Sequence, residues 1–547
     1  MSNHYDIIII GTGSGGSTMA YKLAPSGKRI LILERGGFIP KEKENWDAHE
    51  VVTVGRYRPN DVWLDENDKP FKPFIHYNVG GNSKMYGAAL FRFRESDFEQ
   101  VQHYGGTSPE WPLKYDAYEP YYTMAERLYS AHGKRGVDPT EPWSSSEYPL
   151  PPLPYEPLIE ELNENLVQLG LQPFPLPMGI KLPQDYTHVE APVMLENFDG
   201  FPDPTDSKAD GQVMALRPAL KHKNVTLLTH AYVEKLITDA SGKRVSKVIA
   251  NVKGEKIIFD ADIVIVACGA VNSAALFLRS ANDKHPNGLA NSSGQVGRNL
   301  MLHHNGCLVA FLKDAINECV FQKSLGIADF YNGADDSQFP LGEIQLMGRN
   351  DPDTILWLAE KIYPGKSYEE LKKMTLDFWL TSEDLPSPEN RVTLTRDGQI
   401  KVYYHRNNYT AYERLKEKLK EIFVKVGEMD ARFRDIQWAG YDLDISGMSH
   451  QNGTLRFGTD PTTSVLDLHC KAHDVQNLYV VDASFFVSCG AFNPSLTIAA
   501  NALRVGDHIL DLILNPRLNE AVGQASPKEK EVELNNLNQQ IIEPISN

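Results

Sequence analysis

Three glycines near the start of the chain have the spacing of a loop that binds phosphates. Gly11, Gly13 and Gly16 fit the pattern G-x-G-x-x-G, and Ser14 lies within it. In such a loop the first glycine permits a tight turn, the second lets the backbone approach a pyrophosphate, and the third lets a helix pack on a strand. Glu34 follows about 20 residues after the first glycine, where a carboxylate can accept hydrogen bonds from ribose hydroxyls. These residues predict a dinucleotide site for FAD or NAD.

The flanking residues supply the strand, helix and strand that such a loop requires. Ile7 to Ile10 is a β-branched run short enough for one buried strand of a parallel sheet. A helix is expected from Ser17 to Ala24, with its N-terminal N–H groups facing any phosphate above the loop. Ile30 to Leu33 is the second strand, and the acid at its end argues against a 2′-phosphate. Arg35, directly after that acid, keeps the 2′-phosphate open as an alternative.

A second group of reactive residues lies far along the chain, in the segment from Ser446 to Ile509. His450 follows a glycine-containing turn, and Asn493 precedes Pro494 at the start of an expected helix. Histidine titrates near neutral pH and can take a proton from a substrate. Asparagine donates and accepts hydrogen bonds but has no proton to lose at neutral pH. The pair therefore predicts a base that takes the proton of a substrate hydroxyl group and an amide that holds the oxygen of that hydroxyl group.

A third buried strand is expected from Leu478 to Val481, between those two residues. Asp482 and Ala483 follow it, at the carboxyl end where strands of a parallel sheet face the ligand crevice. Another strand, turn and helix are expected from Ala261 to Ser280, with Gly269 in the turn. These segments would bring the late histidine to the same crevice as the early glycines.

Composition describes an ordinary globular protein with room for two domains. The chain has 547 residues, of which 41% are hydrophobic and 23% are charged. The formal net charge of −17 disfavours nucleic acid and anionic membrane surfaces as partners. The five cysteines form no C-x-x-C pair, which suits a reducing cytoplasm and predicts neither a disulfide framework nor a metal site. No signal peptide and no membrane span are expected.

The pattern along the chain indicates an α/β domain that is interrupted and later resumed. Residues 224–259 alternate as a meander of short strands, which is typical of an FAD domain rather than a plain NAD domain. Residues 308–442 form a strand-rich α+β block with an amphipathic helix from Thr410 to Val426. The predicted units are a dinucleotide domain over 1–307 with an insertion at about 130–215, a substrate domain over 308–442, a return over 443–514, and a polar tail over 515–547.

At this point the sequence resembles the glucose-methanol-choline (GMC) oxidoreductases, a family of flavoproteins, over roughly residues 5 to 512. The glycine loop with its acid resembles the FAD motif of the family. The other matching segments are Gly80-Gly81-Asn82-Ser83, Gly269-Ala270 with Ser273, Val296-Gly297-Arg298-Asn299-Leu300 with His303, His450-x-x-Gly453-Thr454, the VxDAS segment at Asp482, and Asn493-Pro494. With the last three segments counted as one C-terminal block, five motifs in the order of the family make chance agreement implausible.

The resemblance implies a fold, a cofactor and a set of site residues. The implied fold is a Rossmann-like FAD domain of the glutathione-reductase type with a strand meander, joined to an α+β substrate domain with an antiparallel sheet. His450 is the implied base with Asn493 beside it, and His303 and His304 are expected to pack at the domain junction. The implied FAD-binding residues are Gly11, Gly13, Ser14, Gly16, Glu34, Gly80, Gly81, Asn82, Ser83, Val233, Gly269, Asp482, Ala483, Asn493 and Pro494.

Several positions depart from the family pattern. Met85 occupies the place of a histidine that binds flavin covalently in some members, so noncovalent FAD is expected. Tyr86 replaces an asparagine found in many members, Ala274 and Ala281 replace the proline and glycine of the second signature, and Leu302 replaces an aspartate before His303. The implied activity is oxidation of a CH–OH group of an alcohol or sugar by hydride transfer to the flavin, with oxygen or another compound as the electron acceptor.

Two alternatives stay open at the level of sequence. One is a lyase of the same fold that cleaves cyanohydrins without net redox change, and the other is an NAD-linked or non-catalytic dinucleotide-binding protein. The walls of the substrate pocket are expected from residues 308–442 and 171–210, whose spacing does not identify the substrate. The choice between oxidase and dehydrogenase and the oligomeric state are left open as well.

Overall fold

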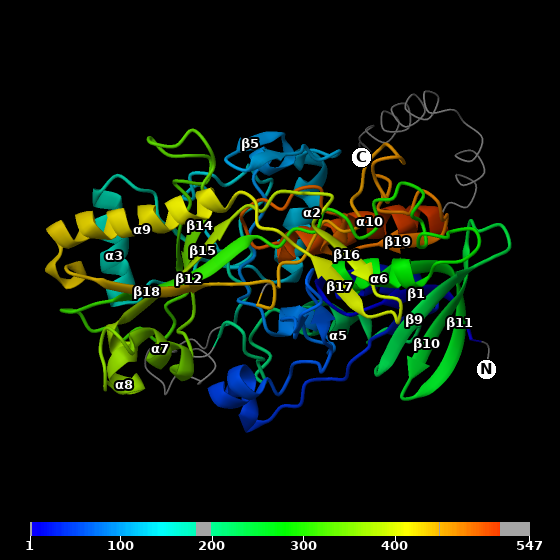
Figure 1. The fold of residues 1–547 in the computed structure, drawn as a ribbon, viewed down its shortest axis with the longest axis horizontal. Helices are drawn as coiled ribbons and strands as arrows, with labels where there is room; N and C mark the ends of the chain where they lie inside the picture. The colour runs from blue at the N-terminus through cyan, green and yellow to red at the C-terminus, as the bar shows by residue number, and fades with distance from the viewer. Residues whose placement is uncertain (1–2, 182–197, 448, 515–547) are drawn as a thin grey trace, which may run out of the picture.

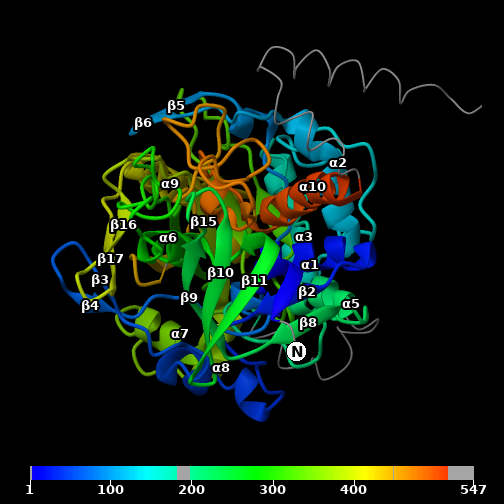
Figure 2. The ribbon, with the colours of Figure 1, turned by 90° about the vertical axis from the view of Figure 1, so that its right-hand side faces the viewer.

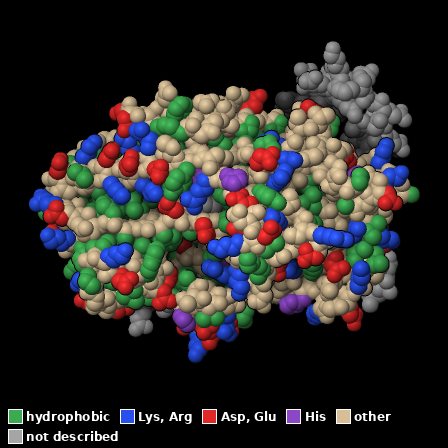
Figure 3. Space-filling model, in the orientation of Figure 1, with side chains coloured by type: hydrophobic (Ala, Val, Ile, Leu, Met, Phe, Trp, Pro, Cys, Tyr) green, Lys and Arg blue, Asp and Glu red, His purple; other side chains and the backbone are tan. Residues whose placement is uncertain are grey.

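Two sheets of different type lie toward opposite ends of the elongated molecule (Figure 1). The computed structural model describes residues 3–181, 198–447 and 449–514. One sheet is mixed and has strands from the beginning, the middle and the end of the chain, while the other is antiparallel. Side chains of both charges are interspersed over the face drawn in Figure 3. The predicted tail over 515–547 lies outside the described residues, as do 16 residues of the excursion over 171–210.

The mixed sheet joins a parallel part to an antiparallel meander. Its parallel part has the order β8-β2-β1-β11, with β19 on the other edge of β11. The meander β9-β10-β11 runs antiparallel, and Figure 2 shows its strands side by side, with α1 and α10 next to the sheet. The strands are β1 (His4–Ile10), β2 (Ile30–Leu33), β8 (Val225–Leu228), β9 (Ala231–Thr238), β10 (Val245–Val252), β11 (Glu255–Val266) and β19 (Leu478–Val480).

The strand β11 corrects one detail of the sequence analysis. Separate strands were expected at Lys256 to Phe259 and at the start of the segment from Ala261 to Ser280, but the structure has one strand of 12 residues. Its first half pairs with β10 in the meander, and its second half pairs in parallel with β1. Asp260 interrupts the hydrophobic pattern without ending the strand, because its carboxylate lies at the edge of the protein beside His4. The meander is therefore an extension of the central strand.

The antiparallel sheet has six strands in the order β18-β12-β15-β14-β13-β7. One face carries Leu308, Phe378 and Leu380, which pack on α9 and α3 in a hydrophobic core. The opposite face carries Cys307 and Val309, which pack beside α7. The strands are β7 (Phe174–Pro175), β12 (His304–Phe311), β13 (Leu325–Ile327), β14 (Glu343–Leu346), β15 (Thr375–Ser382) and β18 (Gln437–Asp442).

Two strands of the 308–442 block pair elsewhere. β16 (Arg391–Leu394) and β17 (Ile400–Tyr403) form a four-stranded sheet with β3 (Trp63–Leu64) and β4 (Pro70–Phe71). Val392 and Val402 pack in one cluster with Val271 and Ala274 of α6, so this sheet covers a helix of the dinucleotide half. β5 (Val101–His103) and β6 (Gly106–Ser108) form a separate hairpin.

The helices cover the sheets, and three of them, α1, α6 and α10, begin close to motifs found in the sequence. The helices are α1 (Ser14–Leu23), α2 (Tyr115–Leu128), α3 (Pro157–Gln168), α5 (Arg217–Ala219), α6 (Ala270–Arg279), α7 (Pro352–Ala359), α8 (Tyr368–Leu371), α9 (Tyr409–Met429) and α10 (Ser495–Leu514). Helix α1 packs against α10, where a side chain at Gly506 would meet Lys22 and Met19. Among the described residues, no helix has the length and apolar character needed to cross a membrane.

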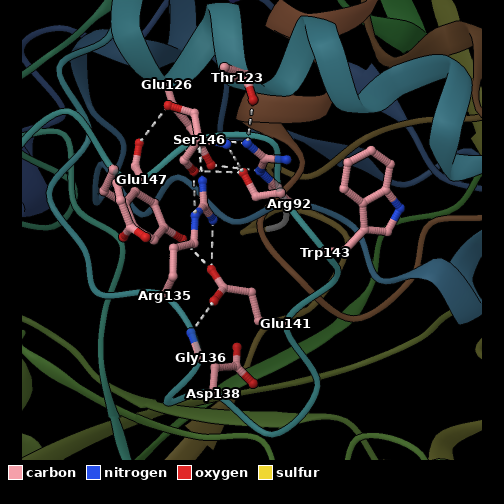
Figure 4. Close-up of polar contacts among 12 residues, drawn as sticks. Arg92, Thr123, Glu126, Arg135, Gly136, Asp138, Glu141, Trp143, Ser146 and Glu147 are labelled. Atoms are coloured by element: carbon pink, nitrogen blue, oxygen red, sulfur yellow. Dashed lines mark hydrogen bonds and ion pairs between the residues drawn. The ribbon is translucent and has the colours of Figure 1, made fainter.

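A buried network of ion pairs ties α2 to residues 92–94, which follow the second glycine loop, Gly80 to Ser83 (Figure 4). The Arg92 guanidinium donates to both oxygens of Glu126 at 2.7 Å, and only 1% of each side chain is exposed. Arg135 donates to the same carboxylate and to Glu141. Because α2 also bonds α10 through Tyr122, the network holds residues 92–94 and α10 in one unit.

We expect Glu126→Gln to destabilise the protein by about 3 kcal/mol, because it leaves two buried guanidinium groups short of their counter-charge. The free energy of unfolding from chemical denaturation measures this. Glu110→Gln is the matched control, since Glu110 pairs with Lys114 at an exposed site and should change stability by about 0.5 kcal/mol or less. Equal effects of the two substitutions would contradict a supporting role for the buried network.

Candidate active site

One cavity of about 580 Å³ connects the glycine loop of the mixed sheet with the antiparallel sheet. Gly11 and Gly13 line it on one side, and Trp379 of β15 and Tyr441 of β18 line it on the other. His450 also lines this cavity, although it lies more than four hundred residues after the glycines. The fold therefore brings the early and late motifs into one space.

Each glycine of the G-x-G-x-x-G loop meets a different steric requirement. Gly11 has a φ of +99°, which side chains disfavour, and a Cβ there would lie 2.3 Å from the Ala267 carbonyl oxygen. Gly16 packs α1 on the loop, because its Cβ would lie 2.1 Å from the Gly11 oxygen. Gly13 differs, since a Cβ there would meet no protein atom within 4 Å. The open space above Gly13 suits a close-lying phosphate.

A further glycine of the same run was missed by the sequence analysis. A Cβ on Gly15 would lie 2.0 Å from the carbonyl oxygen of Val481, just after β19. Gly15 therefore lets α1 approach the strand that carries Asp482. The run GTGSGG shows that a glycine stands at this position. It does not show why a glycine is needed, because the segment that Gly15 contacts lies near the other end of the chain.

The second glycine loop lies directly against the first. Gly80 has a φ of +100°, and its N–H donates to the Thr12 hydroxyl at 3.0 Å. A Cβ on Gly81 would lie 3.0 Å from the Cα of Gly13, so the two backbones are in contact. The Ser83 hydroxyl donates back to the Gly80 carbonyl at 2.6 Å and fixes the turn. Together the loops form one floor of the cavity.

Glu34 lies at the end of β2 with its carboxylate turned to the first loop. One of its oxygens accepts from the Thr12 N–H at 3.0 Å and the Thr12 hydroxyl at 2.5 Å, and the other accepts from the Gly36 N–H at 2.9 Å. Burial raises the pKa of Glu34, while these hydrogen bonds oppose the shift. The carboxylate lines the cavity and retains lone pairs for hydroxyl donors.

Arg35 is already paired within the protein. Its guanidinium donates to both oxygens of Asp61 at 2.7 Å and stacks between the rings of Tyr77 and Tyr232. Because its charge is balanced and both its faces are covered, this arginine is poorly placed to bind a 2′-phosphate. The geometry therefore favours a dinucleotide without a 2′-phosphate, as the acid at position 34 indicates.

Asp482 joins two of the predicted motifs, its own segment and the one that contains Gly269 and Ser273. One oxygen accepts from the Gly269 N–H at 3.0 Å and from the Ser273 hydroxyl, and the other accepts from the Ser484 N–H at 2.9 Å. Only 6% of the residue is exposed, and burial raises its pKa. These contacts hold the ends of β11 and β19 and the start of α6 together beside the cavity.

The predicted cofactor residues converge on the cavity, with two exceptions. Gly16 and Gly80 lie behind its wall and shape the two loops. Thr12, Lys323 and Trp379 line the cavity but were missed, because a side chain between glycines or on a sheet face carries no motif of its own. The predicted residues along the cavity are Gly11, Gly13, Ser14, Glu34, Gly81, Asn82, Ser83, Val233, Gly269, Asp482, Ala483, Asn493 and Pro494.

A chain of hydrogen bonds fixes the proton positions on His450. The Nε2 atom of His303 lies 3.0 Å from the Cys489 carbonyl oxygen, which can only accept, so Nε2 carries the proton. In the neutral ring, the Nδ1 of His303 is then an acceptor. It lies 3.0 Å from the Nδ1 of His450, which must therefore donate. The remaining nitrogen of His450, Nε2, keeps a free lone pair.

The Asn305 amide nitrogen lies 3.5 Å from the same Nδ1 of His450. This distance is at the outer limit for a hydrogen bond, and an amide N–H cannot donate to a nitrogen that already carries a proton. The shorter bond to His303 therefore decides the tautomer. No described residue donates a hydrogen bond to the His450 Nε2.

Both imidazoles are kept neutral by their surroundings. Burial lowers the pKa of His303, and burial with the neighbouring His303 and Lys323 lowers the pKa of His450 to about 3. His303 has a φ of +63°, in the left-handed region that is costly for a residue with a side chain. Such strain persists where the surroundings demand one geometry, and here it places the ring between Cys489 and His450.

His303 was expected only to pack at the domain junction. The structure instead places it in hydrogen-bonding contact with the predicted base. Asn493, the other predicted catalytic residue, lines the same cavity, and its side-chain oxygen accepts from the Gln345 amide at 3.1 Å. His450 is thus held by His303, whose motif did not indicate this contact, and Asn493 is held by Gln345, which belongs to no motif.

The far end of the cavity is polar and lies on the antiparallel sheet. Lys323 forms an ion pair with Asp199 at 2.7 Å, and the second oxygen of Asp199 accepts from the Gly348 N–H at 2.6 Å. Trp379 and Tyr441 lie on the same face. An aromatic surface beside charged and amide groups suits a substrate with both C–H and hydroxyl groups. Among the described residues, no group of three His, Cys, Asp or Glu side chains could hold a metal ion.

The residues present fit a dinucleotide that carries a flavin. Helices α1 and α10 both begin at the cavity, where the Ser14 and Ser495 hydroxyls lie 3.1 Å apart, so two positive helix ends converge. Gly13 leaves room for the pyrophosphate, and Glu34 lies where ribose hydroxyls would donate. The cavity continues past these groups to His450, which leaves space for a ring system between the glycines and the histidine.

Comparison with known proteins agrees with this geometry. Two family models described as GMC oxidoreductase match residues 5–305 and 386–502. The 6‴-hydroxyparomomycin C oxidase of Streptomyces lividus is 29% identical, with 91% of this chain and 90% of the relative covered. The 2-methyl-1,2-propanediol dehydrogenase of Mycolicibacterium austroafricanum is 28% identical, with 92% and 95% covered.

A solved structure shows the same fold at low identity. Pyridoxine 4-oxidase from Mesorbium loti aligns with a TM-score of 0.63 and 18% sequence identity, covering 92% of this chain and 98% of that one. At this identity the likeness concerns the fold alone.

The glycine geometry predicts that two alanine substitutions act in opposite ways. Gly13→Ala should leave the apoprotein within about 1 kcal/mol of its original stability, since its Cβ meets no protein atom, but should weaken dinucleotide binding at least about tenfold. Gly16→Ala, whose Cβ would lie 2.1 Å from the Gly11 oxygen, should destabilise the apoprotein itself. Thermal unfolding of apoprotein and titration with the dinucleotide separate these effects. Unchanged binding by Gly13→Ala would contradict the placement of the phosphates.

Proposed function

This chain belongs to the GMC oxidoreductase family and is an FAD-dependent oxidoreductase, and we propose that it oxidises the CH–OH group of an alcohol or sugar to a carbonyl, with His450 as the base. The two similar proteins named above are an oxidase and a dehydrogenase. Their names support oxidation at a hydroxyl-bearing carbon, and the activity assigned to this chain follows from that similarity together with the site.

The single observation that carries the proposal is the bare Nε2 of His450. Oxidation of an alcohol by hydride transfer requires that the hydroxyl proton leave as the hydride leaves carbon. A neutral imidazole with an unprotonated nitrogen facing the substrate can take this proton. The chain from the Cys489 carbonyl through His303 to His450 supports this state, because it places the proton of His450 on Nδ1.

Each residue then has a defined task. The substrate hydroxyl donates to the Nε2 of His450, and its proton moves to that nitrogen. The Asn493 amide holds the same oxygen, and its donor side stabilises the negative charge that develops there. The low pKa of His450 keeps the ring in its accepting form at neutral pH. FAD, when bound, supplies the acceptor for the hydride.

The FAD would be held by the groups that form the cavity floor. The first glycine loop and the α1 N-terminus would receive the pyrophosphate, Glu34 would receive the ribose hydroxyls, and the second glycine loop would lie against the flavin. We propose that the flavin is bound noncovalently. Met85 lines the cavity at the place where some family members have a histidine, and a thioether forms no such bond to the ring.

Several finer points are proposals as well. The dinucleotide-binding unit is assigned to 1–307 and 443–514 and the substrate unit to 308–442, which the separate sheets support apart from β7, β16 and β17. The five cysteines are all free, which supports the cytoplasm as the location. The substrate is a small alcohol or sugar, and oxygen or another compound accepts the electrons. The lyase and the NAD-linked alternatives have no supporting observation.

His450→Ala should retain bound FAD and lose about 10² to 10⁴-fold in turnover, because a positioned base contributes that much. Anaerobic reduction of the flavin by a panel of alcohols and sugars, followed by its absorbance, measures the loss. His473→Ala is the control, since His473 lies outside the cavity and bonds to Ser464. Normal flavin reduction by His450→Ala would refute the base assignment, and cyanohydrin cleavage without flavin reduction would favour the lyase.

Acid denaturation should release the flavin into solution. No histidine stands at position 85 to retain it, so the supernatant should be yellow and the precipitate colourless. The absorbance of the two fractions measures the distribution. Flavin that stays with the precipitated protein would show a covalent link and contradict the argument from Met85.

A further inference from the structure

The Asn493 amide is held by a second pair of buried side chains that the proposed mechanism does not use. The Gln345 amide nitrogen donates to the Asn493 side-chain oxygen at 3.1 Å and to a Glu343 carboxyl oxygen at 2.6 Å. Glu343 and Gln345 are alternate residues of β14, so both side chains leave the same face of the antiparallel sheet. The three residues form a continuous hydrogen-bonded row that ends at the cavity.

This row lies on the face of the sheet that carries the polar end of the cavity. Gln345 is directly opposite Trp379, which lines the cavity, and Glu343 is opposite Thr381. Glu343 is fully buried, and Gln345 is 1% exposed. Burying an acid and an amide away from water costs free energy unless they are well bonded. A sheet face that needed only packing would carry apolar residues here, as the opposite face does at Ile344 and Leu346.

The row determines which way the Asn493 amide points. An asparagine side chain has one oxygen that accepts and one nitrogen that donates, on opposite sides of a planar group. Because the Gln345 N–H occupies the oxygen, the nitrogen of Asn493 is turned to the other side. A rotation of 180° would place two N–H groups against each other, which the buried site disfavours. The acceptor oxygen of Glu343 fixes the orientation of Gln345 in the same way.

We propose that Gln345 is a positioning residue for Asn493, and that Glu343 in turn positions Gln345, so that the Asn493 N–H donates to the substrate oxygen. The inference rests on the proposed function, because it assigns the reacting oxygen as the partner of that N–H. A donor is needed there rather than an acceptor, since the oxygen gains negative charge as its proton moves to His450. Burial raises the pKa of Glu343 to about 8, which agrees with a role through hydrogen bonds rather than charge.

The test is a double-mutant cycle on the rate of anaerobic flavin reduction. Gln345→Met has a similar length and no hydrogen-bonding groups, and it should slow flavin reduction about tenfold with the KM nearly unchanged. The donor acts mainly in the transition state, so kcat rather than KM reports its loss. In an Asn493→Ala background the same substitution should have no further effect, because the group it positions is gone.

Two more variants separate positioning from packing. Glu343→Gln keeps an acceptor oxygen for Gln345 and should retain the rate within about twofold, whereas Glu343→Leu should behave like Gln345→Met. Val309→Ala removes buried side-chain volume from the same face of the sheet, beside Asp377 and away from the row, and serves as the control. Bound FAD and the unfolding midpoint are measured for every variant.

Equal slowing by Gln345→Met with and without Asn493 would overturn the inference while leaving the function intact. Slowing by Val309→Ala as large as that by Gln345→Met would also overturn it, since any disturbance of the face would then suffice. Absence of flavin reduction by any alcohol or sugar in the unmodified enzyme would overturn both the function and the inference.

Discussion

The hydrogen bond between two neutral imidazoles, His303 and His450, is the interaction on which this site depends. It sets the tautomer of the base and leaves one nitrogen free for the substrate proton. Three segments must meet for it to form, namely the turn before β12, the loop after β18 and the chain that carries Cys489 before α10. The mixed sheet brings the last of these to the cavity through β19, while the antiparallel sheet brings the first two.

The need to hold this hydrogen bond in one geometry also explains why so many polar groups are buried around the cavity. Asp482 ties β11, β19 and α6 together, and the Arg92 network ties α2 to the chain beyond the second glycine loop. Each costs free energy of desolvation unless its hydrogen bonds are complete. In exchange, the loops that face the cofactor cannot shift independently, and a base placed to within a fraction of an ångström requires such a frame.

Local sequence patterns made the elements of the dinucleotide half predictable. They did not indicate the contacts between segments that lie far apart in the chain. The strand at Ile30 to Leu33 and the turn at Gly269 follow from residues within a few positions. The strand β11 was predicted as two strands, because Asp260 interrupts its hydrophobic pattern. The structure tolerates this acid because its carboxylate lies at the protein surface beside His4. The contact of His303 with His450 and the row from Glu343 to Asn493 needed the tertiary structure, because neither has a spacing in sequence. The N–H of Leu302, which departs from the family motif, donates to the Asp384 carboxylate at 2.8 Å, another contact that the sequence pattern does not indicate.

Neutron diffraction from a crystal of the FAD-bound enzyme would locate the hydrogen atoms on the two imidazoles and so test the tautomer of His450. We expect deuterium on Nε2 of His303 and on Nδ1 of His450, with no deuterium on Nε2 of His450. Deuterium on the Nε2 of His450, with none on its Nδ1, would contradict the assignment of this residue as the base that takes the substrate proton.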